Sequence, residues 1–292
     1  YLFNMSTLRV AVALAVFVSL LDIAQLVFVN DPICGTKNVV NPQTRVAGGF
    51  SARLADWPWA VTLKACLGNK NCLPSTKQHR CDGILISKKH VLTAAHCLLN
   101  ADPYIPTDVH LGDLHLDPNV NNGSFGMDIP ILNYVTHPLF VKPFPDNDIA
   151  IITLKESVKF TNFIRPICLP TDQNLRTRNF VGTNPFHVGW GYDPLSRAAY
   201  RGLHVAQITV QTCNDTSWGF HLNPNQLCAG GNGKGGCEGD SGGPLNYQYY
   251  GKWYVIGIFS YLHLCVPSGA PKGPSIYVRV TSYLDWISDN IH

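Results

Sequence analysis

The chain has 292 residues, of which 46% are hydrophobic and 14% are charged, and its formal net charge is +3. The apolar share predicts a globular fold rather than a disordered chain, and the length suits one large β domain or two fused barrels. The small net charge gives no indication of nucleic acid or of an anionic membrane, so we expect neither as a partner.

The ten cysteines are even in number and scattered, and no Cys-x-x-Cys pair occurs. This pattern indicates disulfide bonds and an oxidising compartment, and it argues against a structural metal site. The sequons Asn122-Gly123-Ser124 and Asn214-Asp215-Thr216 fit N-glycosylation at Asn122 and Asn214. Together these features predict a secreted, extracellular protein.

The first residues fit a targeting segment. Arg9 precedes an apolar run from Val10 to Leu21, which is too short to span a bilayer but suits the core of a signal peptide. We therefore expect residues 1–30 to be leader and signal peptide, although no clear small-residue cleavage site marks their end. The alternative is a signal anchor from Val10 to Val29, which Asp22 interrupts.

Beyond residue 46, short apolar runs alternate with Gly, Pro, Asn and Asp, which predicts many short strands in an all-β barrel or sandwich. The stretch from Ser282 to Ile291 predicts a terminal helix with Tyr283, Trp286 and Ile287 on one face. Residues 160–184 are poor in strand signals and could link two halves. The expected strands are Ala60–Leu63, Gly83–Ile86, Val91–Thr93, Val109–Leu111, Ile129–Val135, Ile149–Leu154, Phe186–Val188, His204–Val210, Trp253–Ile258 and Ile276–Val280.

Ser241 lies in the stretch Gly-Asp-Ser-Gly-Gly-Pro, between Gly239 and the pair Gly242-Gly243. Without bulky neighbours, its hydroxyl can stand clear of the backbone, and nearby N–H groups can point at one spot as an oxyanion hole requires. By composition alone, the stretch is equally a glycine-rich surface turn. The letters also fit the Gly-x-Ser-x-Gly elbow of α/β-hydrolases, but the upstream chain lacks alternating helices.

Two further stretches carry candidate catalytic groups. His96 follows the small residues of Leu-Thr-Ala-Ala, and Asp148 precedes the apolar run Ile149 to Ile152. Taken singly, His96 would be a structural histidine and Asp148 a turn or strand cap. Together with Ser241 they stand in the order His, Asp, Ser, whereas α/β-hydrolases use the order Ser, acid, His.

At this point a resemblance is plain. The motifs Ala-Ala-His-Cys, Asn-Asp-Ile-Ala, Gly-Trp-Gly and Gly-Asp-Ser-Gly-Gly-Pro fall in one order, and from Cys34 onward the chain resembles chymotrypsin-fold serine endopeptidases. The resemblance implies an all-β fold of two six-stranded antiparallel β-barrels with a C-terminal helix. It also implies a short disulfide-tethered propeptide at 31–45 and a protease domain at 46–292, divided near 160–184.

By this resemblance, Ser241 attacks the scissile carbonyl while His96 accepts its proton and later gives it to the leaving amine. Asp148 orients the imidazole, Ser260 supports Asp148, and the N–H groups of Gly239 and Ser241 form the oxyanion hole. No cofactor is implied. All three triad residues are present, which disfavours the alternative of a non-catalytic, protease-like binding protein.

The resemblance also implies activation by cleavage between Arg45 and Val46, although these residues alone could form a plain loop. The new α-amino group of Val46 would pair with Asp240, because a buried carboxylate without a partner is costly. The chain as written is then a zymogen, and Arg45 implies a trypsin-like activating protease. Further expected partners are a protein or peptide substrate and protein inhibitors, and we expect a monomer.

Disulfide pairing follows from the resemblance, because the sequence alone does not fix it. Pro185 and Tyr247 stand where the family carries a further disulfide, and both cysteines are absent together. The implied pairs are Cys34–Cys168, Cys81–Cys97, Cys213–Cys228 and Cys237–Cys265, and Cys66 and Cys72 remain to close a local loop.

The primary specificity pocket of the family maps onto Gly235, where trypsins carry an aspartate, so we expect a non-tryptic preference. Leu262 and Ser275 replace wall glycines and resemble elastases, which accept small aliphatic side chains. A deeper chymotrypsin-like pocket is the alternative, because Gly235 and Gly236 leave depth below Leu262. Glu238 at the rim should disfavour acidic substrate residues. The implied pocket residues are Gly235, Gly236, Glu238, Ser260, Tyr261, Leu262 and Ser275.

A calcium loop is not clearly indicated. Asp113 suits the first ligand position, but no later acidic partner is clear, although Asp117 and Asp128 lie near it in sequence. We therefore expect no metal. Digestion, venom action, clotting and immune cascades all fit a secreted enzyme with a short propeptide.

Overall fold

The structure is a computed structural model. It describes residues 30–37, 50–68, 71–99, 103–120, 123–124, 126–143, 145–193, 198–199, 202–213, 222–231, 234–262, 265–266, 270–271 and 273–291. Residues 1–29 of the expected leader and signal peptide, the Arg45–Val46 bond, Asn122 and Asn214 lie outside these residues. Residues 30–291 belong to one compact unit. Within the described chain, no helix has the length and apolar character needed to cross a bilayer.

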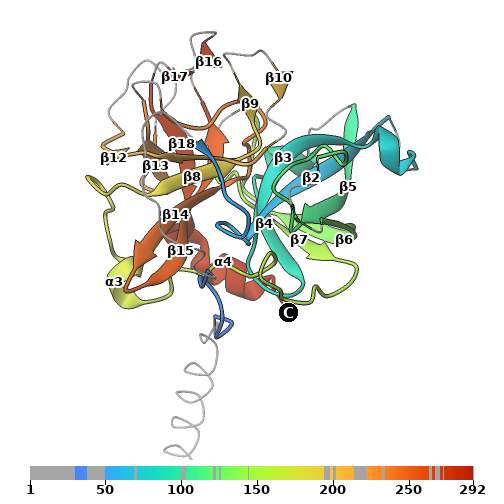
Figure 1. Cartoon of the computed structure of the whole chain (residues 1–292). Helices are drawn as coiled ribbons and strands as arrows, with labels where there is room; N and C mark the ends of the chain where they lie inside the picture. The colour runs from blue at the N-terminus through green and yellow to red at the C-terminus, as the bar shows by residue number, and fades with distance from the viewer. Residues whose placement is uncertain are drawn as a thin grey trace, which may run out of the picture. The chain divides into compact units, whose positions relative to one another are not determined.

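Six antiparallel strands of the first half close into a barrel in the order β2-β3-β4-β7-β6-β5 (Figure 1). Most buried side chains of these strands are apolar, although polar residues such as Thr62, Asp82 and Thr93 are also buried. Strand β7 has the sequence Ala-Ile-Ile-Thr-Leu and pairs with β4 and with β6. The barrel predicted for this half is confirmed. Its strands are β2 (Ala60–Leu67), β3 (Gln78–Leu85), β4 (His90–Thr93), β5 (Tyr104–Leu111), β6 (Met127–Thr136) and β7 (Ala150–Leu154).

The second half forms an antiparallel sheet in the order β1-β11-β8-β14-β15-β18-β13-β12. β11 and β12 stand near opposite ends of this order, but only Ile208 and Thr209 separate them in sequence. One extended segment therefore meets both ends of the sheet, which makes the sheet barrel-like. Its strands are β1 (Phe50–Ser51), β8 (Phe186–Gly189), β11 (His204–Gln207), β12 (Val210–Gln211), β13 (Gln226–Ala229), β14 (Pro244–Tyr249), β15 (Lys252–Tyr261) and β18 (Ser275–Arg279).

Two short ribbons, β9 (Tyr192–Asp193) with β10 (Ala198–Ala199) and β16 (Cys265–Val266) with β17 (Ala270–Pro271), complete the described strands. The sequence did not predict β13 or β14. β13 begins with a glutamine and β14 with a proline, and both include polar residues, so neither gives an apolar run. They form because each is hydrogen-bonded to a strand on both edges: β13 to β12 and β18, and β14 to β8 and β15.

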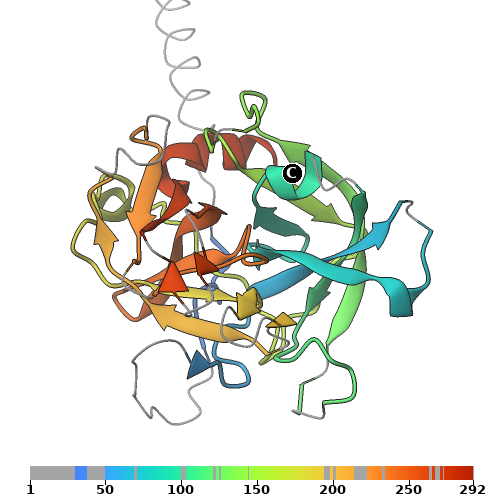
Figure 2. The same ribbon diagram turned by 90° about the horizontal axis from the view of Figure 1, so that it is seen from above.

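Helices are few and short: η1 (Pro74–Thr76), α2 (His96–Leu99), α3 (Gln173–Arg176), η3 (Val280–Tyr283) and α4 (Leu284–Asp289). The predicted terminal helix is confirmed as α4, which lies where the two sheets meet in Figures 1 and 2. The ring of His137, just after β6, lies 5.3 Å from the rings of both Tyr283 and Trp286. The end of the chain is thus packed on the first barrel.

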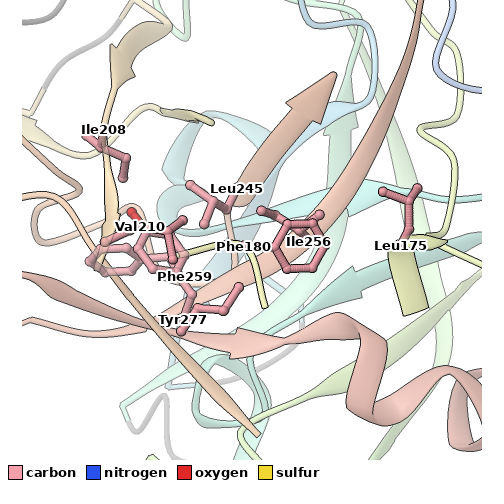
Figure 3. Close-up of a cluster of buried hydrophobic side chains, with 10 residues drawn as sticks. Leu175, Phe180, Ile208, Val210, Leu245, Ile256, Phe259 and Tyr277 are labelled. Atoms are coloured by element: carbon pink, nitrogen blue, oxygen red, sulfur yellow. The ribbon is translucent and has the colours of Figure 1, made fainter. Parts of the chain in front are cut away.

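The core of the second sheet is a cluster of buried side chains from strands, from α3 and from connecting segments that are far apart in sequence (Figure 3). Phe259 and Tyr277 pack edge to face within it at 5.4 Å, and Leu262 packs against it from outside. The buried members are Leu175, Phe180, Ile208, Val210, Leu227, Ala229, Leu245, Ile256, Phe259 and Tyr277.

Disulfide bonds join Cys34–Cys168, Cys66–Cys72, Cys81–Cys97 and Cys213–Cys228, which are pairs that the sequence analysis expected. Cys237 is also disulfide-bonded. The side chain of Cys265, its expected partner, lies outside the described part of the structure.

Candidate active site

His96 and Asp148 meet on the first barrel. His96 begins α2 directly after β4, and Asp148 stands just before β7, which pairs with β4. Nδ1 of His96 lies 2.6 Å from Oδ2 of Asp148, and the backbone N–H of His96 donates to Oδ1 at 2.8 Å. Asp148 is buried and therefore fixes both the position and the orientation of a half-exposed imidazole.

Asp148 also accepts a hydrogen bond from the second sheet. The hydroxyl of Ser260, on β15, donates to Oδ2 of Asp148 at 2.6 Å. The two residues before Asp148 reach the same half: the amide of Gln226 donates to Asp146 at 3.2 Å, and the hydroxyl of Tyr283 donates to Asn147 at 3.0 Å. Three consecutive side chains thus connect the two halves beside the site.

Ser241 reaches this place from the loop between Cys237 and β14. Its carbonyl oxygen accepts the backbone N–H of Asp82 at 2.7 Å and lies 3.6 Å from Sγ of Cys97, the residue after His96. The next residue, Gly242, has φ +85°, and a Cβ there would lie 2.2 Å from Oγ1 of Thr93 at the end of β4. Only glycine permits the serine loop to approach the histidine strand so closely.

Asp240, just before Ser241, is a buried carboxylate with several partners. It accepts the backbone N–H groups of Gly191 at 2.8 Å and Cys237 at 2.7 Å, and Nε2 of His187 lies 3.4 Å from Oδ2. Burial opposes ionisation, but His187 and these N–H groups outweigh it and hold the pKa of Asp240 below its ordinary value. An ionised Asp240 therefore holds the start of its own loop, at Cys237, and the backbone after β8, at Gly191.

A second buried carboxylate, Asp82, lies next to the first. It accepts from the backbone N–H of Trp190 at 3.0 Å and lies 2.9 Å from Nε2 of His79. A Cβ on Gly189 would meet Asp240 at 2.1 Å and Asp82 at 2.5 Å, so both carboxylates crowd one glycine. Burial raises the pKa of Asp82 to about 6, against the opposing effect of His79.

A family model described as Trypsin matches residues 46–287. This chain belongs to the trypsin family of serine proteases. It is 39% identical to a venom serine protease of Bombus ignitus over 87% of this chain and 70% of that protein. It is 38% identical to a venom protease of Bombus pensylvanicus over 82% and 96%, and 34% identical to chymotrypsin-C of Bos taurus over 86% and 90%.

The predicted recognition, fold and enzyme class are therefore confirmed: the chain is a serine endopeptidase of the trypsin family. The structure brings His96, Asp148 and Ser260 into contact and places the Ser241 loop beside Cys97. Asp82, His187 and His79 were not identified from the sequence. An aspartate inside the otherwise apolar end of β3 was the signal that could have revealed Asp82.

Beside His96 and Asp148, this trypsin-family protease has a cavity of about 360 Å³. The sequence analysis included only Ser260 and Tyr261 of its remaining lining, because the other wall comes from the irregular loop after β6. The cavity is lined by His96, Asp148, Ser260, Tyr261, Phe140, Lys142, Pro143 and Pro145.

Among the residues predicted for the primary pocket, Ser260 and Tyr261 end β15, and Ser275 begins β18, which pairs with β15. Gly235, Gly236 and Glu238 lie in the loop between β13 and β14. Ser275 is fully buried, and its hydroxyl finds no hydrogen-bond partner within the described residues. A Cβ on Gly236 would lie 2.3 Å from the Phe259 ring, so the glycine makes room for an aromatic core residue. Glu238 is exposed.

Asp113 and Asp128, considered above as calcium ligands, hold a histidine between them in this protease. Nδ1 of His110 lies 2.6 Å from Asp128 and Nε2 lies 3.2 Å from Asp113, while Lys64 pairs with Asp128 at 2.8 Å. Burial works against a charged His110, but its two carboxylate partners prevail and raise its pKa. Asp117 instead accepts backbone and side-chain N–H groups of Asn119.

Proposed function

We propose that this trypsin-family protein is a secreted endopeptidase that cuts peptide bonds with His96, Asp148 and Ser241 through an acyl-enzyme. The observation that carries the proposal is the chain of contacts from Ser260 through Asp148 to Nδ1 of His96, each at 2.6 Å. This chain fixes the imidazole so that Nε2 is left to exchange a proton with a nucleophile. Ser241, on the loop beside Cys97, is that nucleophile.

The expected roles follow from this placement. Nε2 of His96 accepts the Ser241 proton as the hydroxyl attacks the carbonyl, and the N–H groups of Gly239 and Ser241 stabilise the resulting oxyanion. His96 then protonates the leaving amine, and water releases the acyl group by the same steps. The buried charge of Asp148 stabilises the imidazolium that forms in each transition state.

Activation is proposed to require cleavage between Arg45 and Val46 by a trypsin-like protease. The family match begins at residue 46, which supports this boundary. The ammonium of Val46 would pair with Asp240, whose carboxylate already holds the backbone at Gly191 and Cys237. Extracellular action on protein substrates, control by protein inhibitors and a monomeric state belong to the same proposal.

For specificity we propose a preference for small aliphatic residues before the cut bond. Gly235 offers no charge for a basic side chain, and Leu262 and Ser275 narrow the pocket. A peptide library cleaved by the Arg45-processed protein tests this point. Cleavage after Ala or Val would support it, cleavage after Phe, Tyr or Leu would favour a deep chymotrypsin-like pocket, and cleavage after Arg or Lys would refute it.

The catalytic assignment is tested with a covalent probe directed at activated serines. Protein cleaved after Arg45 should be labelled at Ser241, whereas Ser241→Ala and His96→Ala should abolish labelling and turnover. Arg45→Gln should leave the protein inactive after treatment with trypsin. Absence of labelling in folded, processed protein would instead favour a protease-like binding protein without catalysis.

A further inference from the structure

The amino-terminal segment 30–37 is held tightly against the second sheet. Cys34 is bonded to Cys168, the N–H of Gly35 donates to Pro166 at 2.9 Å, and the N–H of Trp253 donates to Gly35 at 3.0 Å. Gly35 has φ +63°, and a Cβ there would lie 2.3 Å from the carbonyl oxygen of Trp253. The backbone therefore approaches β15 at a distance that only glycine allows.

Two residues later, the segment places a lysine over three indole rings. Nζ of Lys37 lies 3.5 Å from the ring centre of Trp57, 4.2 Å from that of Trp253 and 6.0 Å from that of Trp59. We call these three tryptophans the aromatic box. Phe186 packs behind it, 5.7 Å from Trp57 and 5.6 Å from Trp253. An ammonium over an indole face is attracted by the negative face of the ring.

The Lys37 ammonium is largely withdrawn from water. Burial lowers its pKa to about 8, against the opposing effect of the Asp56 carboxylate. At neutral pH the side chain still carries its charge, so the contact with the box is that of a cation. Lys37 is only partly buried as a residue, but its ammonium lies against the rings of Trp57 and Trp253.

Lys37 is also a possible cleavage site for a trypsin-like protease. Residues 31–45 contain two basic side chains, Lys37 and Arg45, and either could be the residue before a cut by a trypsin-like protease. Such a protease must draw the basic side chain into its own pocket, which requires that side chain to leave its present contacts. A cut after Lys37 would start the new chain at Asn38, eight residues before Val46.

We propose that the aromatic box shields Lys37 from the activating protease and thereby directs cleavage to Arg45. This inference rests on the proposed activation at Arg45–Val46 and deepens it, because it assigns a device that selects the site. The box also keeps the cut segment in place through a second attachment, three residues after the Cys34–Cys168 bond.

The test compares where trypsin cuts the full-length chain, with the new termini read by mass spectrometry. In wild type the terminus at Val46 should form and the terminus at Asn38 should not. In the Arg45→Gln background, Lys37–Asn38 should resist cleavage while the box is intact. Adding Trp57→Leu should speed that cut about tenfold or more, and Trp57→Phe should give an intermediate rate, because a phenyl face binds cations less strongly.

A second design keeps every ring. The exchange Thr36→Lys with Lys37→Thr moves the lysine one position along the segment and away from the box. In the Arg45→Gln background we expect trypsin to cut the bond between positions 36 and 37. Carbon-13 NMR of the lysine Cε gives an independent reading: the pKa of Lys37 should be about 8 in wild type and should rise toward the ordinary 10.5 in Trp57→Leu.

Equal cleavage after Lys37 with the box intact and with Trp57→Leu would overturn the proposal. Resistance at this segment in both Trp57→Leu and the exchanged variant would also overturn it, because the backbone would then be the protecting element. Failure of the proposed function would give a different result. Protein that starts at Val46 would lack activity, whatever the fate of the bond after Lys37.

Discussion

At the scale of single residues, Ser260 is where the second sheet touches the charge of Asp148. Its hydroxyl donates to Oδ2 at 2.6 Å, on the oxygen that also faces Nδ1 of His96. We expect Ser260→Ala to lower kcat about ten- to hundredfold with a small effect on KM, because a hydrogen bond to a buried charge is worth about 1.5–3 kcal/mol. Ser260→Thr keeps the hydroxyl and should retain more activity in a steady-state assay.

Asp82 should make stability depend on pH. Its pKa in the folded protein is about 6, above the ordinary 3.8, so the folded state disfavours the charged form. Stability from this group is present below pH 4 and is lost as pH rises through 6, on the order of 3 kcal/mol. Denaturant unfolding of Asp82→Asn between pH 4 and 7 should show a flatter pH dependence. Asp289→Asn, at an exposed aspartate, should leave the wild-type dependence unchanged.

Sequence reasoning located residues whose motifs are local. His96, Asp148 and Ser241 were found because the neighbours of each one form a distinctive stretch. Asp82 and His187 were missed because their meaning depends on contacts between distant strands. Asp82 accepts a hydrogen bond from Trp190, which is 108 positions away in sequence, and the residues around neither of them indicate that contact.

At the scale of elements, His110 ties the end of β5 to Asp113 and to Asp128 on β6. The raised pKa of His110 means that this stabilisation is full below about pH 6.5 and is lost as pH rises above it. His110→Gln should cost about 1–2 kcal/mol at pH 6 and less at pH 8.5. Denaturant unfolding at the two pH values measures this, and an equal loss at both would contradict the charged form of His110.

The contribution of Asp128 to stability has the opposite pH dependence. Burial opposes its ionisation, but His110 and Lys64 lower its pKa to about 2. Its contribution is therefore present above pH 4 and is lost as pH falls toward 2.

The ends of some strands were not predictable from the sequence. β2 extends to Leu67 and β5 starts at Tyr104 because the two strands pair with each other beyond their apolar runs.

At the scale of the whole molecule, Cys34–Cys168 closes a loop of 134 residues, whereas Cys66–Cys72 closes one of six. The chain-entropy model gives about 5 kcal/mol for the long loop and about 2 kcal/mol for the short one. We expect the double variant Cys34→Ser/Cys168→Ser of the uncleaved chain to lose correspondingly more stability than Cys66→Ser/Cys72→Ser. Equal losses of stability in denaturant unfolding would show that loop length does not determine how much each disulfide bond stabilises this protein.

The short apolar runs predicted an all-β barrel or sandwich, the resemblance implied two barrels, and the family match supports that plan. The way in which the second sheet closes was not predictable. His204 to Val210 gives one apolar run in sequence, but its ends pair with β8 and with β13, on opposite sides of the sheet. Such a division depends on where two other strands lie, which no local pattern encodes.

The consecutive residues Asp146, Asn147 and Asp148 have a consequence for chimaeras. Each bonds a different element of the second half: Gln226 on β13, Tyr283 before α4, and Ser260 on β15. A hybrid enzyme that joins the first barrel of one relative to the second barrel of another would keep both cores yet mismatch this seam. We expect that transferring these three contacting pairs together is the smallest change that restores a catalytic site between barrels taken from two different relatives.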